Sequence, residues 1–232
     1  MVTCVPRYAI YYAPPEASAL GAFGRRWFGD NGPPVAGFSR ERQTLLTATC
    51  RQYGFHATLK APFRLIRQTS AAELRAELAA FARRQSPVPV PPLRLGVLGE
   101  FLALVPRGPT PAVMRLAGAC VRTFDHLRAS PTRAELARRR TAGLSGREAA
   151  LLARWGYPYV MDQFRFHLTL TDPIREEVER AAIARRLLPV LAPLGKAALS
   201  IDAICLFRQD ETGGLFVIDQ RFRLSGAMTP LG

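Results

Sequence analysis

Residues 53–63 read YGFHATLKAPF, and residues 164–174 read FRFHLTLTDPI. Both stretches contain the pattern Phe-His-x-Thr-Leu-x-x-Pro, in which His56 and His167 take the same place. The chain has three histidines, so the repeat accounts for two of them. A segment rich in helix formers follows each copy. The repeat therefore predicts a duplicated chain with one histidine in each half.

Each copy has the alternation of a strand, in which every second side chain points to the same face. Apolar residues lie on one predicted face of each copy, and polar residues lie on the other. The polar face of the first copy carries His56, Thr58 and Lys60. The polar face of the second copy carries His167, Thr169 and Thr171. We therefore expect each strand to be buried on one side and to present a histidine on the other.

Two such strands predict a pseudo-twofold arrangement, with the imidazoles on opposite sides of a cleft. In-line displacement at phosphorus needs a proton acceptor on one side and a proton donor on the other. An imidazole suits both roles, because its pKa of about 6.5 lies near physiological pH. Thr58 and Thr169 can donate hydrogen bonds to non-bridging oxygens, and Lys60 adds a cation in the first half only. The pattern leaves open which histidine is the base.

Further residues can line the same cleft. Arg7 and Tyr11 lie on a predicted opening strand, and Tyr157 and Tyr159 lie just before the second motif. The tyrosines can equally belong to the core or the rim. The run Arg138–Arg140 can clamp a second phosphate or form a solvated helix face.

The sequence offers no alternative catalytic apparatus. It has no HExxH motif or other cluster at metal-ligand spacing, so we expect no metal and no cofactor. It has no GxSxG motif, and we see no cysteine near either repeat that predicts a covalent nucleophile.

The remaining pattern predicts similar halves without a flexible linker, and hence a single bilobal domain over residues 1–232 with lobes of roughly residues 1–108 and 109–232. In the first half we expect strands at 7–12 and 55–59, helices at 16–28 and 70–84, and a strand pair within 93–105. In the second half we expect helices at 111–127, 131–141, 145–155 and 174–191, a strand at 164–171, and a hairpin of 198–207 with 215–224.

Composition sets further limits. The chain is 48% hydrophobic, which is globular and not disordered composition. Its 32 Lys and Arg against 18 Asp and Glu give a net charge of +14, which favours an anionic partner or reflects a solvated basic surface. The four cysteines form no CxxC pair, which fits a reducing compartment. Without a secretory signal or an apolar run of about 18 residues, we expect a soluble cytoplasmic protein that does not bind membranes.

The paired motifs resemble those of the two-histidine (2H) phosphoesterase superfamily. Residues 7–12, 53–63 and 154–171 further resemble the branch of phosphonate-metabolism proteins. The resemblance implies an α+β fold of two lobes, each an antiparallel sheet flanked by helices, around an active cleft. It also implies metal-independent hydrolysis or formation of cyclic phosphodiesters, with His56, Thr58, His167 and Thr169 in the family's motif positions.

The expected function is thus a phosphodiesterase that hydrolyses a small cyclic phosphate, and the branch resemblance implies a ribose cyclic phosphate. An RNA-end 2′,3′-cyclic phosphodiesterase is the alternative enzyme, which the positive charge suits. A module that binds a phosphorylated ligand or RNA without turnover is the alternative outside enzymology.

Overall fold

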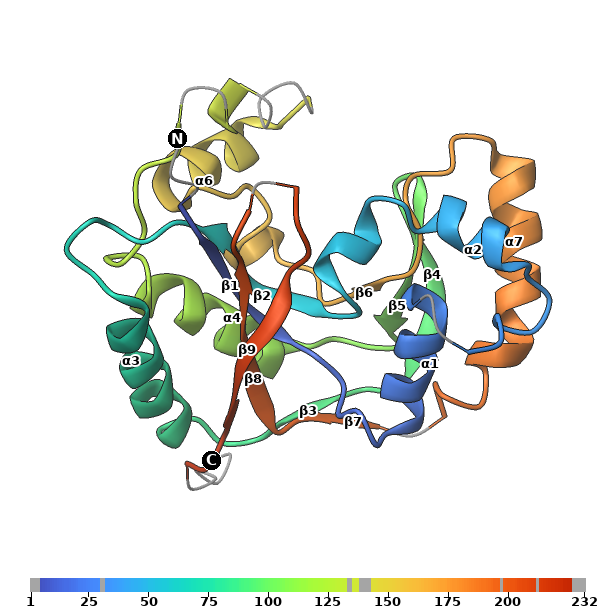
Figure 1. The fold of residues 1–232 in the computed structure, drawn as a ribbon, viewed down its shortest axis with the longest axis horizontal. Helices are drawn as coiled ribbons and strands as arrows, with labels where there is room; N and C mark the ends of the chain where they lie inside the picture. Colours follow the sequence, from blue (N-terminus) through green and yellow to red (C-terminus); the bar gives the residue numbers. More distant parts are fainter. Residues whose placement is uncertain are drawn as a thin grey trace.

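The computed structural model describes residues 5–29, 32–132, 135–137, 143–196, 198–211 and 213–226. The strands of these residues form three antiparallel sheets (Figure 1). A four-stranded sheet has the order β2 (Ala57–Phe63), β1 (Arg7–Tyr12), β8 (Ala203–Gln209), β9 (Val217–Arg223). A three-stranded sheet has the order β4 (Leu93–Leu98), β5 (Phe101–Pro106), β6 (Leu168–Thr169). A two-stranded sheet joins β3 (Val88–Val90) to β7 (Leu199–Ile201).

Helices surround these sheets (Figure 1). They are α1 (Ala19–Phe28), α2 (Arg40–Leu46), α3 (Ala71–Arg83), α4 (Pro111–Thr123), α6 (Gly146–Trp155) and α7 (Glu177–Leu191), with short 3₁₀ turns η1 (Cys50–Tyr53) and η2 (Met161–Gln163). α3 contacts β8 and β9, α4 contacts β2, and α7 contacts β4 and β5. Ser70 and Ser145 begin α3 and α6 as capping boxes, because each hydroxyl accepts from the backbone N–H three residues on. The α+β class with antiparallel sheets is confirmed.

The sheets do not divide at residue 108. The four-stranded sheet pairs β1 and β2 with β8 and β9, and the three-stranded sheet pairs β4 and β5 with β6. Each lobe is therefore built from both halves of the chain. Such an exchange has a physical reason, because the incoming strands pair with backbone groups that would otherwise stay open at a sheet edge.

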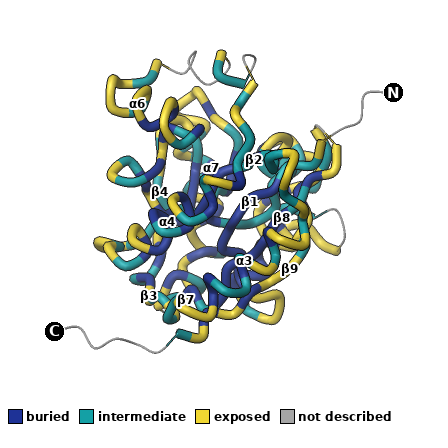
Figure 2. Tube along the Cα trace, turned by 90° about the vertical axis from the view of Figure 1, so that its left-hand side faces the viewer, coloured by how far each residue is buried: buried dark blue, intermediate teal, exposed yellow. Residues whose placement is uncertain are grey.

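One apolar core runs through both lobes. It includes Ile10, Leu59, Leu104 and Leu168, each less than 3% exposed, so strands of both larger sheets contribute to it. In Figure 2, β1 is dark blue while the exposed residues lie mainly on outer loops and helix faces. Trp27, which is fully buried, donates from Nε1 to the carbonyl of Leu170 at 2.6 Å and ties α1 to the second motif. The two larger sheets therefore share one continuous apolar core.

A bulge in β2 changes the face of one predicted site residue. Thr58 lies opposite Tyr11, but Lys60 lies opposite Ile10, so Leu59 is an extra residue in the ladder. Beyond the bulge the alternation is reversed. Lys60 points into the core with 3% exposure, and the prediction that it shares a face with His56 is wrong. Simple alternation could not reveal this inserted residue.

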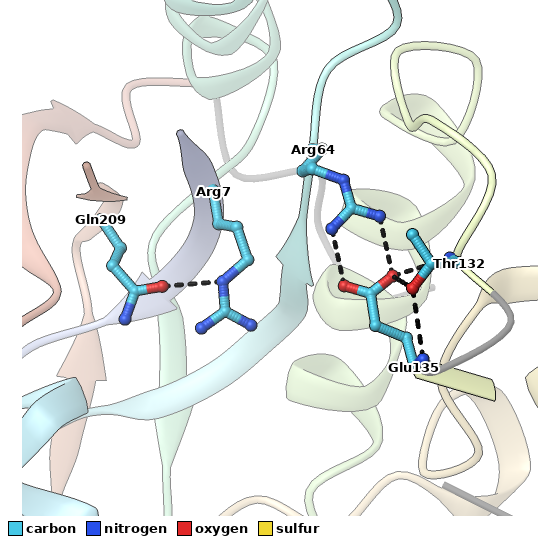
Figure 3. Close-up of polar contacts among 5 residues, drawn as sticks. All are labelled: Arg7, Arg64, Thr132, Glu135 and Gln209. Carbon is cyan, nitrogen blue, oxygen red and sulfur yellow. Dashed lines mark hydrogen bonds and ion pairs between the residues drawn. The ribbon is translucent and has the colours of Figure 1, made fainter. Parts of the chain in front are cut away.

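A polar network centred on Glu135 holds the segment that follows β2 (Figure 3). Both terminal nitrogens of Arg64 donate to the carboxylate of Glu135 at 2.7 Å. The same carboxylate accepts from the backbone N–H of Thr132 at 2.8 Å. Residues 135–137 are helical, in agreement with the predicted helix at 131–141, and Arg138–Arg140 lie outside the described residues.

Most of the other predicted elements lie close to their observed bounds. The strand predicted at 55–59 is instead β2 (Ala57–Phe63), and the strand predicted at 198–207 is divided between β7, which pairs with β3, and β8, which pairs with β9. Two further elements differ. The predicted strand at 164–171 is extended, but only Leu168 and Thr169 pair with β5. The predicted helix at 111–127 ends at Thr123. Within the ranges given above, no helix has both the length and the apolar content needed to cross a bilayer.

Lys60 should cost the protein stability. Its ammonium donates to the carbonyl of Val121 at 3.3 Å and lies 3.8 Å from Asp125, and burial lowers its pKa to about 8. The unfolded chain therefore binds the proton more tightly, and the cost is present at pH 7 and declines between pH 8 and about 10.5. Asp125 also pairs with Arg128 at 2.7 Å, so it keeps a cation when Lys60 is removed.

We expect Lys60→Met to raise the free energy of unfolding at pH 7 by roughly 1 to 3 kcal/mol, because it replaces a buried cation with an apolar side chain of similar length. Urea denaturation of wild type and variant measures the change. A loss of stability would show that the ammonium contributes more through its two contacts than its burial costs.

Candidate active site

A cleft of about 760 Å³ lies where the two larger sheets meet. Strand β2 and the loop before it contribute His56 and Thr58, and strand β6 and the residue before it contribute His167 and Thr169. Both histidines directly precede a strand, so the repeat in the sequence is also a repeat in structure. The cleft brings together two motifs that lie more than a hundred residues apart.

His56 is held on three sides. Its Nδ1 donates to the carbonyl of Gly54 at 2.9 Å, which fixes the ring plane and the tautomer. Tyr11 stacks on the imidazole, with ring centroids 3.9 Å apart and planes inclined by 23°. With Nδ1 protonated, Nε2 is the acceptor, and the Thr58 hydroxyl can donate to it at 3.3 Å. Gly54 has φ 68°, a conformation that favours glycine, and so turns this carbonyl toward the ring.

His167 has the same constraint. Its Nδ1 donates to the carbonyl of Arg165 at 2.8 Å, again two residues before the histidine. Phe101 of β5 lies beside the ring, with centroids 5.8 Å apart. In both histidines Nδ1 is occupied by backbone, so Nε2 is the nitrogen that can meet a ligand, and in His56 the Thr58 hydroxyl lies beside it at 3.3 Å.

The environment keeps both imidazoles neutral. Burial lowers the pKa of His56 to about 4, although the bond to Gly54 acts in the opposite direction and His167 adds a smaller lowering. Burial also lowers the pKa of His167. Each ring can therefore accept a proton at neutral pH. An anion bound between the rings would favour the charged form and raise the pKa values.

The motifs are also tied to each other. The carboxylate of Asp172, in the second motif, accepts from the backbone N–H groups of Thr49 and Cys50 at 2.7 and 2.8 Å. These residues begin η1, which leads directly into the first motif. The hydroxyl of Thr171 accepts from the backbone N–H of Leu102 at 3.0 Å and anchors the second motif to β5.

The structure brings nearly all of the predicted site residues to this cleft. Besides the histidines and the two motif threonines, its lining includes Arg7, Tyr11, Tyr157, Tyr159 and Thr171. Tyr157 and Tyr159 meet edge to face at 5.6 Å, and Tyr159 is 45% exposed at the rim. Tyr11 is buried, which raises the pKa of its hydroxyl and keeps it neutral. Lys60 does not line the cleft.

Sequence reasoning missed several lining residues. Cys50 and Tyr53 come just before the first motif and Asp172 lies within the second, so their nearness in sequence could have indicated them. The expectation of no cysteine near either motif is wrong, because Cys50 lines the cleft three residues before Tyr53, but burial raises the pKa of its thiol and makes it a poor nucleophile. Phe101 belongs to the β4–β5 hairpin and has no signal in the sequence. Within the described part of the chain, no three His, Cys, Asp or Glu side chains are grouped so as to hold a metal ion.

A family model described as "Protein of unknown function (DUF1045)" matches residues 58–217. The chain belongs to the DUF1045 family. The matched range includes Thr58 and the whole second motif but begins after His56.

The DUF1045 chain also matches curated proteins. It is 38% identical over 235 residues to "Ribose 1,5-bisphosphate phosphokinase PhnN" of Janthinobacterium sp. (strain Marseille), covering 95% of this chain and 51% of the relative. It is 36% identical over 217 residues to the protein of the same name from Laribacter hongkongensis (strain HLHK9), covering 90% of this chain and 50% of the relative. The chain thus spans about half the length of these relatives.

Among solved structures, E. coli LigT complexed with 3′-AMP matches with a TM-score of 0.43 and 15% identity, covering 95% of this chain and 98% of LigT. This likeness concerns the fold alone. Another match is a structure described as a phosphoesterase, with a TM-score of 0.42 and 15% identity, covering 94% of this chain and 98% of that protein.

The pKa of His56 provides a test of the site. Because its folded value of about 4 lies below the unfolded value of about 6.5, the unfolded chain binds more protons between these limits and stability falls as pH decreases through them. In NMR titrations we expect His56 to titrate near pH 4 and to move upward when inorganic phosphate is added. A value near 6.5 that phosphate leaves unchanged would show that the ring is solvated and away from any anion site.

Proposed function

We propose that the chain is a phosphoesterase that opens a small cyclic phosphodiester by acid–base catalysis between His56 and His167. The supporting observation is that both imidazoles line one cleft, each with Nδ1 bound to the backbone and Nε2 left for a ligand. A cyclic phosphate between the rings would have one imidazole on the side of the attacking water and the other on the side of the leaving oxygen.

The reaction then follows from the protonation states. A neutral imidazole accepts a proton from water at Nε2 while the water oxygen bonds to phosphorus. The other imidazole, protonated with the help of the anionic substrate, donates its Nε2 proton to the leaving oxygen as the P–O bond breaks. Water is thereby added across one ester bond, and the base is left protonated while the acid is left neutral. The next cycle needs the protons to return through solvent.

The motif threonines are placed to act on the same phosphate. Thr58 and Thr169 each follow a histidine by two residues, and both are half-buried in the cleft lining. Their hydroxyls can donate to the non-bridging oxygens, where negative charge increases during attack.

For the substrate we propose a ribose cyclic phosphate, 5-phosphoribosyl 1,2-cyclic phosphate. When water breaks the bond between phosphorus and O2 of this compound, the phosphate stays on C1 and the product is ribose 1,5-bisphosphate. That product is the compound in the name of the two curated relatives, of which this chain matches about half. A phosphoesterase that makes ribose 1,5-bisphosphate would directly supply a kinase that uses it.

A second candidate is an RNA-end 2′,3′-cyclic phosphodiesterase. The net charge of +14 suits a polyanion, and Tyr159 at the rim offers an exposed ring for a base. The third possibility is binding of a phosphorylated ligand without turnover.

One assay separates the three. The purified protein is incubated with 5-phosphoribosyl 1,2-cyclic phosphate, with 2′,3′-cyclic nucleotides and with an oligonucleotide ending in a cyclic phosphate. The proposal expects turnover of the sugar phosphate in preference to the others. Preferred turnover of the oligonucleotide selects the RNA reading, and binding without any turnover selects the non-catalytic module.

We expect His56→Ala and His167→Ala each to lower turnover by roughly 10²- to 10⁴-fold, since each removes a proton donor or acceptor. His126→Ala is the matched control, because its side chain is 60% exposed and lies outside the cleft. Steady-state kinetics of the three variants measure the effect. Near-normal activity in either cleft variant would refute its role in proton transfer.

Thr58→Ala and Thr169→Ala should have smaller effects. Each removes one hydrogen bond to a charged oxygen, worth about 1.5 to 3 kcal/mol, so turnover should fall roughly 10- to 10²-fold. A fall as large as that of the histidine variants, at unchanged stability, would mean that the hydroxyls take part in proton transfer.

A further inference from the structure

We propose that Arg7, held by Gln209, forms a second phosphate subsite that makes the cleft selective for a cyclic sugar phosphate carrying an additional phosphate group. The inference rests on the proposed function and deepens it. It concerns the part of the substrate that does not react.

One hydrogen bond orients the Arg7 side chain. Its Nε donates to Oε1 of Gln209 at 2.7 Å (Figure 3). Gln209 is 2% exposed, and its own Nε2 donates to the carbonyl of Gly214 at 2.6 Å, so both ends of the amide are used. The amide is therefore fixed, and it orients the guanidinium through Nε, which leaves the edge formed by the two terminal nitrogens for an anion.

The remaining face of the guanidinium suits an anion. Within the described ranges, the two terminal nitrogens of Arg7 have no hydrogen bond and no carboxylate partner. Phe216 lies against the guanidinium, 5.4 Å from its ring centre, and restricts the motion of the side chain. Two parallel N–H donors on a half-buried fork match the oxygens of a phosphate.

Arg7 lies on the same face as the histidine site. Arg7 pairs with Gln209, and Tyr11 pairs with Cys205, so the two positions share a face of the four-stranded sheet. Four residues along a strand correspond to about 13 Å between their Cα atoms. Tyr11 stacks on His56, which places the guanidinium and the imidazole toward opposite ends of one cleft.

A chain of ring contacts sets the spacing between the two subsites. The ring centres of His56 and Tyr11 are 3.9 Å apart, those of Tyr11 and Phe216 are 6.3 Å apart, and Phe216 is 5.4 Å from Arg7. The guanidinium is thus separated from the imidazole by two aromatic rings. A phosphate on the far side of a five-membered sugar from the reacting phosphorus would reach it.

The charges of the cleft favour this assignment. Glu148 also lines the cleft, and its carboxylate has a lowered pKa because of hydrogen bonds from Ser145 and, to a smaller extent, the charge of Arg165, the other lining arginine. The carboxylate of Asp172 is occupied by backbone N–H groups. Arg7 is therefore positioned to attract a second anionic group without competition from these carboxylates.

The test compares two substrates that differ by one phosphate, 5-phosphoribosyl 1,2-cyclic phosphate and ribose 1,2-cyclic phosphate, in wild type and Arg7→Met. We expect Arg7→Met to lower kcat/KM for the first substrate by roughly 10²-fold and to change that for the second by less than about threefold. Equal effects on both substrates, or no effect on either, would overturn the subsite.

Gln209 is a positioning residue, and its role is tested by measuring KM and kcat separately. Gln209→Leu should raise KM for the substrate with two phosphates at nearly constant kcat, and should leave the substrate with one phosphate unaffected. A loss of stability alone would reduce activity on both substrates equally. Arg208→Met is the matched control, since Arg208 is the neighbour of Gln209 in β8 and points to the opposite face of the sheet.

Binding measurements separate failure of the subsite from failure of the proposed function. Calorimetry compares ribose 1,5-bisphosphate with ribose 1-phosphate in wild type and Arg7→Met, and needs no turnover. If the protein turns over neither cyclic substrate but binds the bisphosphate more tightly, and Arg7→Met removes this preference, the subsite is supported and the proposed function is overturned. If the protein turns over both cyclic substrates but Arg7→Met does not change the relative affinity for the bisphosphate, the subsite is overturned and the proposed function is supported.

Discussion

Both motif histidines donate from Nδ1 to the backbone carbonyl two residues before them, and the remaining features of the site depend on this constraint. A neutral imidazole has one donor and one acceptor nitrogen, so binding of Nδ1–H to a carbonyl leaves Nε2 as the acceptor. Without these bonds each ring could turn about its side-chain torsions and present either nitrogen. Gly54 carries the first carbonyl in a backbone conformation with φ 68°, so this constraint is encoded beside the histidine itself.

Strand exchange between the two halves brings the two constrained rings to one cleft. β2 belongs to the sheet that β8 and β9 complete, and β6 completes the sheet of β4 and β5. A chain folded as two separate halves would not need to join the motifs. Asp172, in the second motif, also accepts hydrogen bonds from the backbone of η1, the turn before the first motif. These hydrogen bonds help to fix the position of one motif relative to the other.

Much of this could be predicted from the repeat. Its apolar and polar alternation correctly placed Thr58 and Thr169 beside the histidines, and the β-branched and aromatic residues of β1 predicted its bounds at Arg7–Tyr12. Lys60 could not be placed, because the extra residue in β2 depends on pairing with β1. Strand exchange and the contribution of Phe101 depend likewise on contacts between distant segments. The orientation of Arg7 depends on Gln209, 202 residues away, which no local pattern indicates.

The central claim is that two imidazoles act on one phosphorus atom. A crystal structure of the protein with inorganic phosphate bound tests it most directly. The account predicts a single phosphate in the cleft, with Nε2 of His56 and Nε2 of His167 each about 2.6 to 3.2 Å from one of its oxygens. A phosphate that contacts only one of the two rings, or rings whose Nε2 atoms point away from a common anion, would contradict it.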